Sequence, residues 1–217
     1  MAALRWAGAV AALAVTVSLT ACGPLQMGAA AIVGTQRIST STLSSDVAAL
    51  NAVYQAHPAL RRDVQYKPAQ MPRFVLMWLV RFHIIADIAR HDGVQVTPAQ
   101  AQSALAAATV QVERQINASV SAAEFGLLSA VPPNLTTQYG RYRATIEKLA
   151  VLYTGVTNLS SLTQAQQRRF AARISSEVAA SVKRLKIKIN PRFGQLNATQ
   201  LTVVAAPDRL SRPEAAA

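Results

Sequence analysis

The chain is poor in the residues from which most protein sites are built. One cysteine among 217 residues excludes an intramolecular disulfide, so packing must hold the fold together. Of the three histidines, His83 and His91 are eight residues apart, whereas a helical metal pair needs a spacing of about four. The sequence therefore predicts no metal site and no cofactor.

Catalytic motifs are scarce as well. The chain has ten Asp and Glu residues, and no pair of them lies close together inside an apolar segment. It contains no G-x-S-x-G turn and no phosphate-binding glycine loop. We therefore expect a protein that is not an enzyme.

Positive charge is abundant by contrast. Twenty-two Lys and Arg residues give a formal net charge of +12. Such a charge favours anionic surroundings, such as lipid headgroups or acidic polymers. The basic residues are spread along the chain, without a zinc knuckle or an aromatic-interleaved basic ribbon, so nucleic acid is not an expected partner. Solvated helix faces are the simpler interpretation of the charge.

The first 22 residues are typical of an exported precursor. Arg5 precedes an apolar segment over residues 6–17, which is shorter than the ~20 residues that span a bilayer. Small residues then lead to the single cysteine, and Leu19-Thr20-Ala21-Cys22 resembles a bacterial lipobox. The resemblance implies diacylglycerol on Cys22, cleavage before it, and acylation of the new amino terminus, for example by palmitate. The alternative is an uncleaved membrane anchor.

This interpretation divides the chain into four parts. Residues 1–21 are the expected signal peptide and residues 22–28 a lipidated leader. Residues 29–206 have the length of one domain, and residues 207–217 are an expected disordered tail. The expected location is the extracytoplasmic face of the cell membrane, held there by a lipid anchor.

Hydrophobic periodicity predicts a mainly α domain with a short strand near each end. Residues 29–33 predict a strand that ends at Gly34, and residues 38–41 the start of a helix. Helices are expected over 40–56, 71–91, 98–119, 121–130, 135–152 and 163–185. Strict alternation predicts a strand at 186–189, and a small strand is possible near 201–204. The expected inner face of the helix at 98–119 is made of Leu105, Val110, Val112 and Ile116. That of the helix at 135–152 is made of Tyr139, Tyr142, Ile146, Leu149 and Leu152.

Residues 71–91 are the most apolar segment after the signal region. Phe74, Trp78 and Phe82 recur at helical spacing, which favours a buried face. A second interpretation makes Phe74, Met77, Trp78 and Phe82 part of a groove for polypeptide clients, since chaperones use adaptable apolar surfaces.

Two segments resemble the SurA N-terminal-domain family. The first is Gly-Ala-Ala-Ala-Ile-Val-Gly at 28–34, followed by Arg-Ile-Ser at 37–39 and by Leu43. The second is Ile-Lys-Ile-Asn-Pro-Arg-Phe-Gly at 187–194, which is similar to a segment of small actinobacterial lipoproteins. The resemblance implies an extracytoplasmic chaperone body like that of SurA and PrsA, with its first and last strands side by side. No parvulin domain of about a hundred residues is present, so isomerase activity is not implied.

Two functions follow as expectations. The first is a lipid-anchored holdase that binds unfolded exported polypeptides without isomerase activity. The second is a structural or interaction lipoprotein that binds a fixed envelope partner or an anionic polymer. An exposed apolar patch favours the first function, and a flat basic face favours the second.

Overall fold

The computed structural model describes residues 27–56, 67–116, 119, 121–157 and 161–205. The expected signal peptide at 1–21, Cys22 and the expected tail at 207–217 lie outside these residues. The described chain is mainly helical with short antiparallel strands, which confirms the expected fold class. None of its helices is long and apolar enough to cross a bilayer. The elements are β1 (Ala29–Val33), β2 (Gln36–Ser39), α1 (Thr40–Ala56), the 3₁₀ turn η2 (Pro68–Gln70), α3 (Met71–His91), α4 (Pro98–Ile116), α5 (Ala122–Leu128), the 3₁₀ turn η3 (Pro133–Leu135), α6 (Thr136–Thr154), α7 (Gln164–Leu185), β3 (Lys188–Ile189), β4 (Gln195–Asn197) and β5 (Thr202–Val204).

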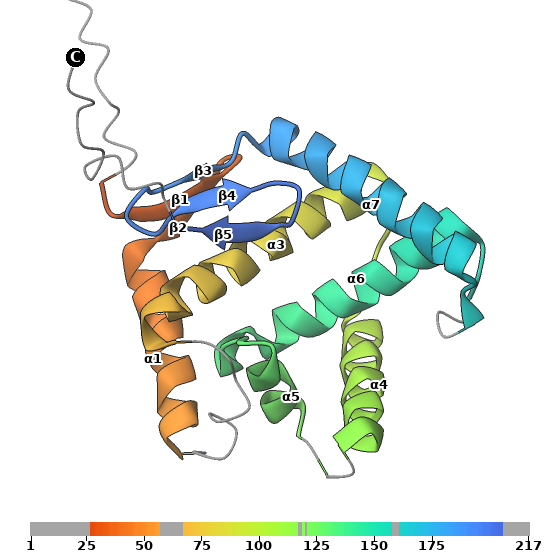
Figure 1. Cartoon of the computed structure of the whole chain (residues 1–217), viewed down its shortest axis with the longest axis horizontal. Helices are drawn as coiled ribbons and strands as arrows, with labels where there is room; N and C mark the ends of the chain where they lie inside the picture. The colour runs from red at the N-terminus through yellow and green to blue at the C-terminus, as the bar shows by residue number, and fades with distance from the viewer. Residues whose placement is uncertain (1–26, 57–66, 117–118, 120, 158–160, 206–217) are drawn as a thin grey trace, which may run out of the picture.

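The two ends of the described chain meet in one antiparallel sheet of order β2-β1-β3. Ala31 pairs with Ile189 and Ile32 with Lys188, and Figure 1 shows β1 beside β3. The predicted pairing of the amino-terminal strand with the strand at 186–189 is therefore confirmed. The Gly34 amide also donates a hydrogen bond to the Leu185 carbonyl (2.6 Å), which ties the β1–β2 turn to the end of α7.

The helix expected over 40–56, with its start at residues 38–41, is confirmed as α1, which begins at Thr40. Residues 36–39 form β2, a strand that the sequence analysis does not predict. Gly34, with a φ of 63°, allows a two-residue turn that folds β2 back along β1. Ile38 is buried in this hairpin, so the first residues of the segment expected to enter the helix belong to the strand.

A second hairpin, β4–β5, follows β3 and contacts α3. It confirms the strand near residues 201–204 and adds β4, which the sequence analysis does not predict. Arg81 Nε donates a hydrogen bond to the Leu201 carbonyl (2.9 Å), and Val203 is buried. The carboxyl-terminal hairpin is thereby fastened to the central helix.

Helix α3 lies at the centre of the fold and contacts α1, α6, α7, β1 and β5. Trp78 is 7% exposed, and its indole donates a hydrogen bond to the Ser129 carbonyl (2.7 Å). The rings of Tyr139 and Tyr142 meet it edge-on, with centroids 5.1 and 5.4 Å away. Met77 is 8% exposed, so the interpretation of this helix as core is confirmed for both residues.

Helices α4 and α6 approach closely because small residues face each other. Ala101, Ala104 and Ala108 are buried, and Ala101 lies beside Gly140 of α6. Val110 is therefore not on the inner face as expected. It is 42% exposed, because it follows Ala108 by two residues and points to the opposite side of the helix.

The expected inner face of α6 is likewise wrong at one position. Leu152 is 54% exposed in the last turn of the helix, whereas Tyr139 and Leu149 are buried. Tyr142 and Ile146 pack against the core while partly exposed. Ile116, at the end of α4, falls outside the described side chains.

Replacing Gly140 by alanine should lower the free energy of unfolding by about 1–3 kcal/mol, the usual range for overpacking. A Cβ at Gly140 would lie 2.8 Å from the Ala101 carbonyl oxygen, and this backbone atom cannot move without separating α4 from α6. Chemical denaturation followed by circular dichroism measures the change. Gly126→Ala is the matched control, because its Cβ would meet its neighbours at an ordinary 3.7 Å. Equal stability of the two variants would contradict the close contact.

Candidate binding pocket

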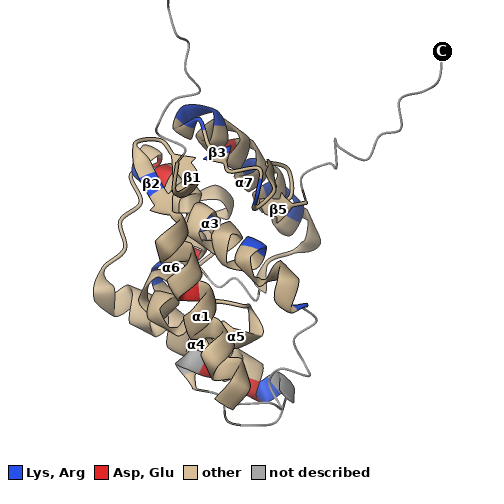
Figure 2. Ribbon diagram, turned by 90° about the vertical axis from the view of Figure 1, so that its left-hand side faces the viewer, with Lys and Arg blue, Asp and Glu red and all other residues tan. Residues whose placement is uncertain are grey.

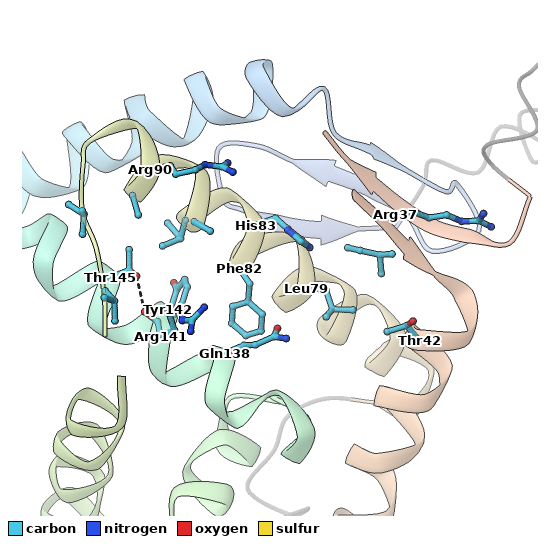
Figure 3. A pocket seen from close by; sticks show the side chains of 16 residues that line it. Arg37, Thr42, Leu79, Phe82, His83, Arg90, Gln138, Arg141, Tyr142 and Thr145 are labelled. Atoms are coloured by element: carbon cyan, nitrogen blue, oxygen red, sulfur yellow. Dashed lines mark hydrogen bonds between the residues drawn. The ribbon is translucent and has the colours of Figure 1, made fainter. Parts of the chain in front are cut away.

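An open cavity of about 620 Å³ lies between α3, α6, β2 and the first turn of α1. Figure 3 shows α3 and α6 facing each other across it, with β2 and the first turn of α1 at one side. The residues that line the cavity are Arg37, Ile38, Thr42, Leu79, Phe82, His83, Ile85, Ala86, Ala89, Arg90, Val94, Val96, Gln138, Arg141, Tyr142 and Thr145.

The floor of the pocket is apolar and aromatic. Phe82 of α3 and Tyr142 of α6 place their ring centroids 5.9 Å apart, and Trp78 lies behind both. Burial raises the pKa of Tyr142, so its phenol stays uncharged in the neutral range. Leu79 and Ile85 extend the same surface along α3. A surface of this kind suits apolar or aromatic groups of a ligand.

The rim of the pocket is cationic. Arg37 comes from β2, Arg90 from the end of α3 and Arg141 from α6, and Figure 3 shows Arg37 and Arg90 at opposite sides of the hollow. Among the described residues that line it, none is acidic. His83 adds no charge at neutral pH, because burial lowers its pKa below the usual value of 6.5. The pocket thus combines an apolar floor with a positive edge.

Arg90 is held by a carboxylate that also anchors α3 to α7. Asp87 accepts hydrogen bonds from Arg90 (3.0 Å), from Ser181 (2.9 Å) and from Arg184 (2.9 Å). Burial by itself raises the pKa of Asp87. The three hydrogen bonds and the charge of Arg184 together lower the pKa by more than burial raises it, so the pKa of Asp87 lies below its ordinary value. Asp87 therefore remains ionised in the neutral range and keeps this end of the pocket in place.

The four residues predicted to bind clients are separated by the fold. Phe82 lines the pocket, and Phe74 is partly buried without lining it. Met77 and Trp78 are buried in the core, so they can support the pocket but offer a ligand little surface. Cys22, the predicted lipid site, lies outside the described residues.

Sequence reasoning missed most of the polar residues of the pocket. Arg37, His83 and Arg141 lie on three elements that are distant in the chain, and no motif links them. Thr145 is satisfied locally, since its hydroxyl donates to the Arg141 carbonyl (2.8 Å), as drawn in Figure 3. The only usable signal was Tyr142, which belongs to the expected inner face of α6, with Arg141 directly before it.

A second group of polar side chains lies where α3, α6 and α7 come together. His91, Asp92 and Glu177 place one ligand-type atom each within 4.8 Å of one another, a combination that could hold a metal ion. The histidine spacing that argued against a metal site is irrelevant here, because Glu177 comes from a different helix. No pattern within either segment could have predicted this meeting.

Comparisons with protein-family models, with curated proteins and with solved structures find no match to this chain. The likeness to the SurA N-terminal-domain family therefore depends on the two sequence segments at 28–43 and 187–194.

Proposed function

We propose that this chain is a lipid-anchored holdase on the extracytoplasmic face of the cell membrane, related to the SurA N-terminal-domain family. It binds apolar segments of unfolded exported polypeptides and releases them without isomerisation. The lipobox-like segment supports the anchor, and the α3–α6 pocket supports the binding. The observation that carries the binding proposal is an open apolar floor within a positive rim.

The size of the pocket suits side chains rather than a whole folded partner. Its volume of about 620 Å³ falls within the range of about 300–1,000 Å³ that is usual for ligand sites. Apolar side chains of an unfolded client would lie over Phe82 and Tyr142, and removing them from water supplies the favourable free energy. Folded clients keep such side chains buried, so they are not bound.

The charge of the rim adds a preference. Arg37, Arg90 and Arg141 lie around the opening. Arg90 is paired with Asp87, and Arg37 donates a hydrogen bond to the Met27 carbonyl, which leaves the Arg37 charge without a carboxylate partner among the contacts described. Acidic residues beside an apolar client segment would therefore be attracted, and basic ones repelled. This contribution weakens with salt, whereas the apolar contribution does not.

Filling the pocket tests the proposal. Ala86 lines the cavity on an exposed position of α3, so Ala86→Trp should occupy the floor and reduce client binding at least fivefold without disturbing the core. The measurement is light scattering of a denatured apolar client diluted into buffer with equimolar residues 22–217 carrying Cys22→Ser. Ala106→Trp, at an exposed position of α4 outside the pocket, is the matched control and should protect the client like the parent protein.

Two results would overturn the holdase proposal or its binding site. Aggregation that the parent protein leaves unchanged would exclude it, and equal protection by Ala86→Trp and Ala106→Trp would exclude this pocket as the site. A second measurement uses two peptides with the same apolar centre, one flanked by Glu and one by Lys. The Glu peptide should bind more tightly at low salt, and the difference should shrink at high salt.

The exposed basic residues of α7 favour a second candidate, an interaction lipoprotein that binds an anionic envelope polymer. Figure 2 shows basic residues along this helix, where Arg168, Arg169 and Lys183 are exposed. Salt-sensitive binding to anionic polymer or anionic vesicles, together with no effect on client aggregation, would favour this candidate over the holdase.

A further inference from the structure

The end of α3 and the middle of α7 bring three metal-binding side chains together. His91 is the last residue of α3 and Asp92 follows it directly. Glu177 reaches them from the middle of α7, and the three ligand atoms lie within 4.8 Å of one another. Ligand atoms at about 2.0–2.2 Å from a tetrahedral Zn²⁺ ion lie about 3.3–3.6 Å apart. Binding would therefore draw the three atoms together by about 1 Å, a movement that the exposed His91 side chain can supply.

Glu177 is an unusual residue to bury. It is 7% exposed, and a buried carboxylate is costly unless a cation lies beside it. In this structure the cation is Arg173, whose guanidinium lies 2.8 Å from Glu177 Oε1. The Arg173 side chain is 56% exposed and rests over the ring of Tyr153, so it can move aside without disturbing the core.

A residue of α6, Tyr153, holds the side chain of Asp92 in position. The Asp92 carboxylate accepts a hydrogen bond from the Tyr153 hydroxyl. Outer hydrogen bonds of this kind hold metal-binding carboxylates in position. An open hollow of about 520 Å³, lined by Asp92, Tyr153, Arg169 and Arg173 among others, leaves a path for an ion and for water.

We propose that His91, Asp92 and Glu177 bind one divalent transition-metal ion, with Arg173 displaced from Glu177. One imidazole nitrogen and two carboxylate oxygens suit Zn²⁺ better than Mg²⁺ or Ca²⁺, which prefer all-oxygen sites. The two carboxylates and Arg173 together carry one negative charge, which favours a cation. Nearby Arg169 opposes it, so we expect micromolar rather than nanomolar affinity.

The bound ion would join α3 to α7. Ala89 and Arg90, which line the binding pocket, directly precede the metal ligands. The ion would therefore hold this end of the pocket wall in one position. Its role is structural and is independent of what the pocket binds.

Titration of the full chain with ZnCl₂ tests the proposal. The chain carries Cys22→Ser, which removes its only thiol, has no affinity tag, and is kept in mild detergent. Isothermal titration calorimetry should show one Zn²⁺ per chain, and Mg²⁺ and Ca²⁺ should bind at least tenfold more weakly. His91→Ala and Glu177→Gln should each weaken Zn²⁺ binding at least tenfold, because each removes one ligand.

His83→Ala is the matched control, since it removes a histidine of the same helix that is not part of the cluster. It should bind Zn²⁺ like the parent chain. Circular dichroism of each variant checks the fold, and exposed His91 decides the outcome if Glu177→Gln does not fold. No Zn²⁺ binding below about 1 mM, or unchanged binding by His91→Ala, would overturn the proposal.

Discussion

Replacing Trp78 by alanine is expected to lower the free energy of unfolding by about 3–5 kcal/mol, the largest loss of stability predicted for this chain. The indole is buried and hydrogen-bonded to the Ser129 carbonyl. It also meets the rings of Tyr139 and Tyr142 edge-on, and the Arg81 guanidinium lies 5.0 Å from its ring centroid. Alanine would leave a cavity between α3 and α6 and break all of these contacts.

Chemical denaturation followed by circular dichroism measures this loss, because the substitution removes a fluorescent reporter. Leu152→Ala serves as the control. Leu152 is an apolar residue of α6 that is 54% exposed, so its removal should change stability by no more than about 0.5 kcal/mol. A loss below about 1 kcal/mol for Trp78→Ala would contradict its place in the core.

Replacing Cys22 by alanine should abolish lipid attachment, the second large effect that we predict. Only a thiol at this position can take the diacylglycerol, and the chain has no other cysteine. The variant should accumulate unprocessed or unanchored. Labelling with a fatty-acid analogue and fractionation of membranes measure this outcome.

Gly23→Ala is the control for anchoring, because it changes the neighbouring residue and keeps the thiol. It should take up label like the parent chain. A parent chain that takes up no label would refute the lipoprotein proposal, whatever the variants do. The holdase measurement, made without the lipid, would be unaffected.

Local sequence signals predicted the helices well. Thr97 directly precedes the helix expected at 98–119; it accepts a hydrogen bond from the Gln100 amide (3.2 Å), and α4 begins at Pro98. Thr163 accepts in the same way from the Gln166 amide at the start of α7. Caps and helical periodicity depend on residues within one or two turns, so they can be read without knowing the rest of the chain.

The same local signals failed where a partner decides the outcome. Residues 36–39 became a strand because β1 lies beside them, and Val110 is exposed because α4 packs through its alanines against Gly140. A large apolar residue predicts an inner face only if the neighbouring helix leaves room for it. For Val110 that room depends on Gly140, thirty positions away in the chain.

The sequence by itself determined the helical fold class, the strands at residues 29–33 and 188–189 and the burial of Trp78, because periodicity and alternation are encoded within each segment. The pairing of these two strands was implied by the resemblance to the SurA N-terminal-domain family, and the structure confirms it. Only the tertiary structure decided the candidate sites. The pocket takes its floor from α3 and α6 and its positive rim from β2, α3 and α6. The His91, Asp92 and Glu177 cluster joins residues 85 positions apart. Such contacts arise when helices that are distant in the chain pack together, and the pattern of residues within one helix does not predict which helix lies beside it.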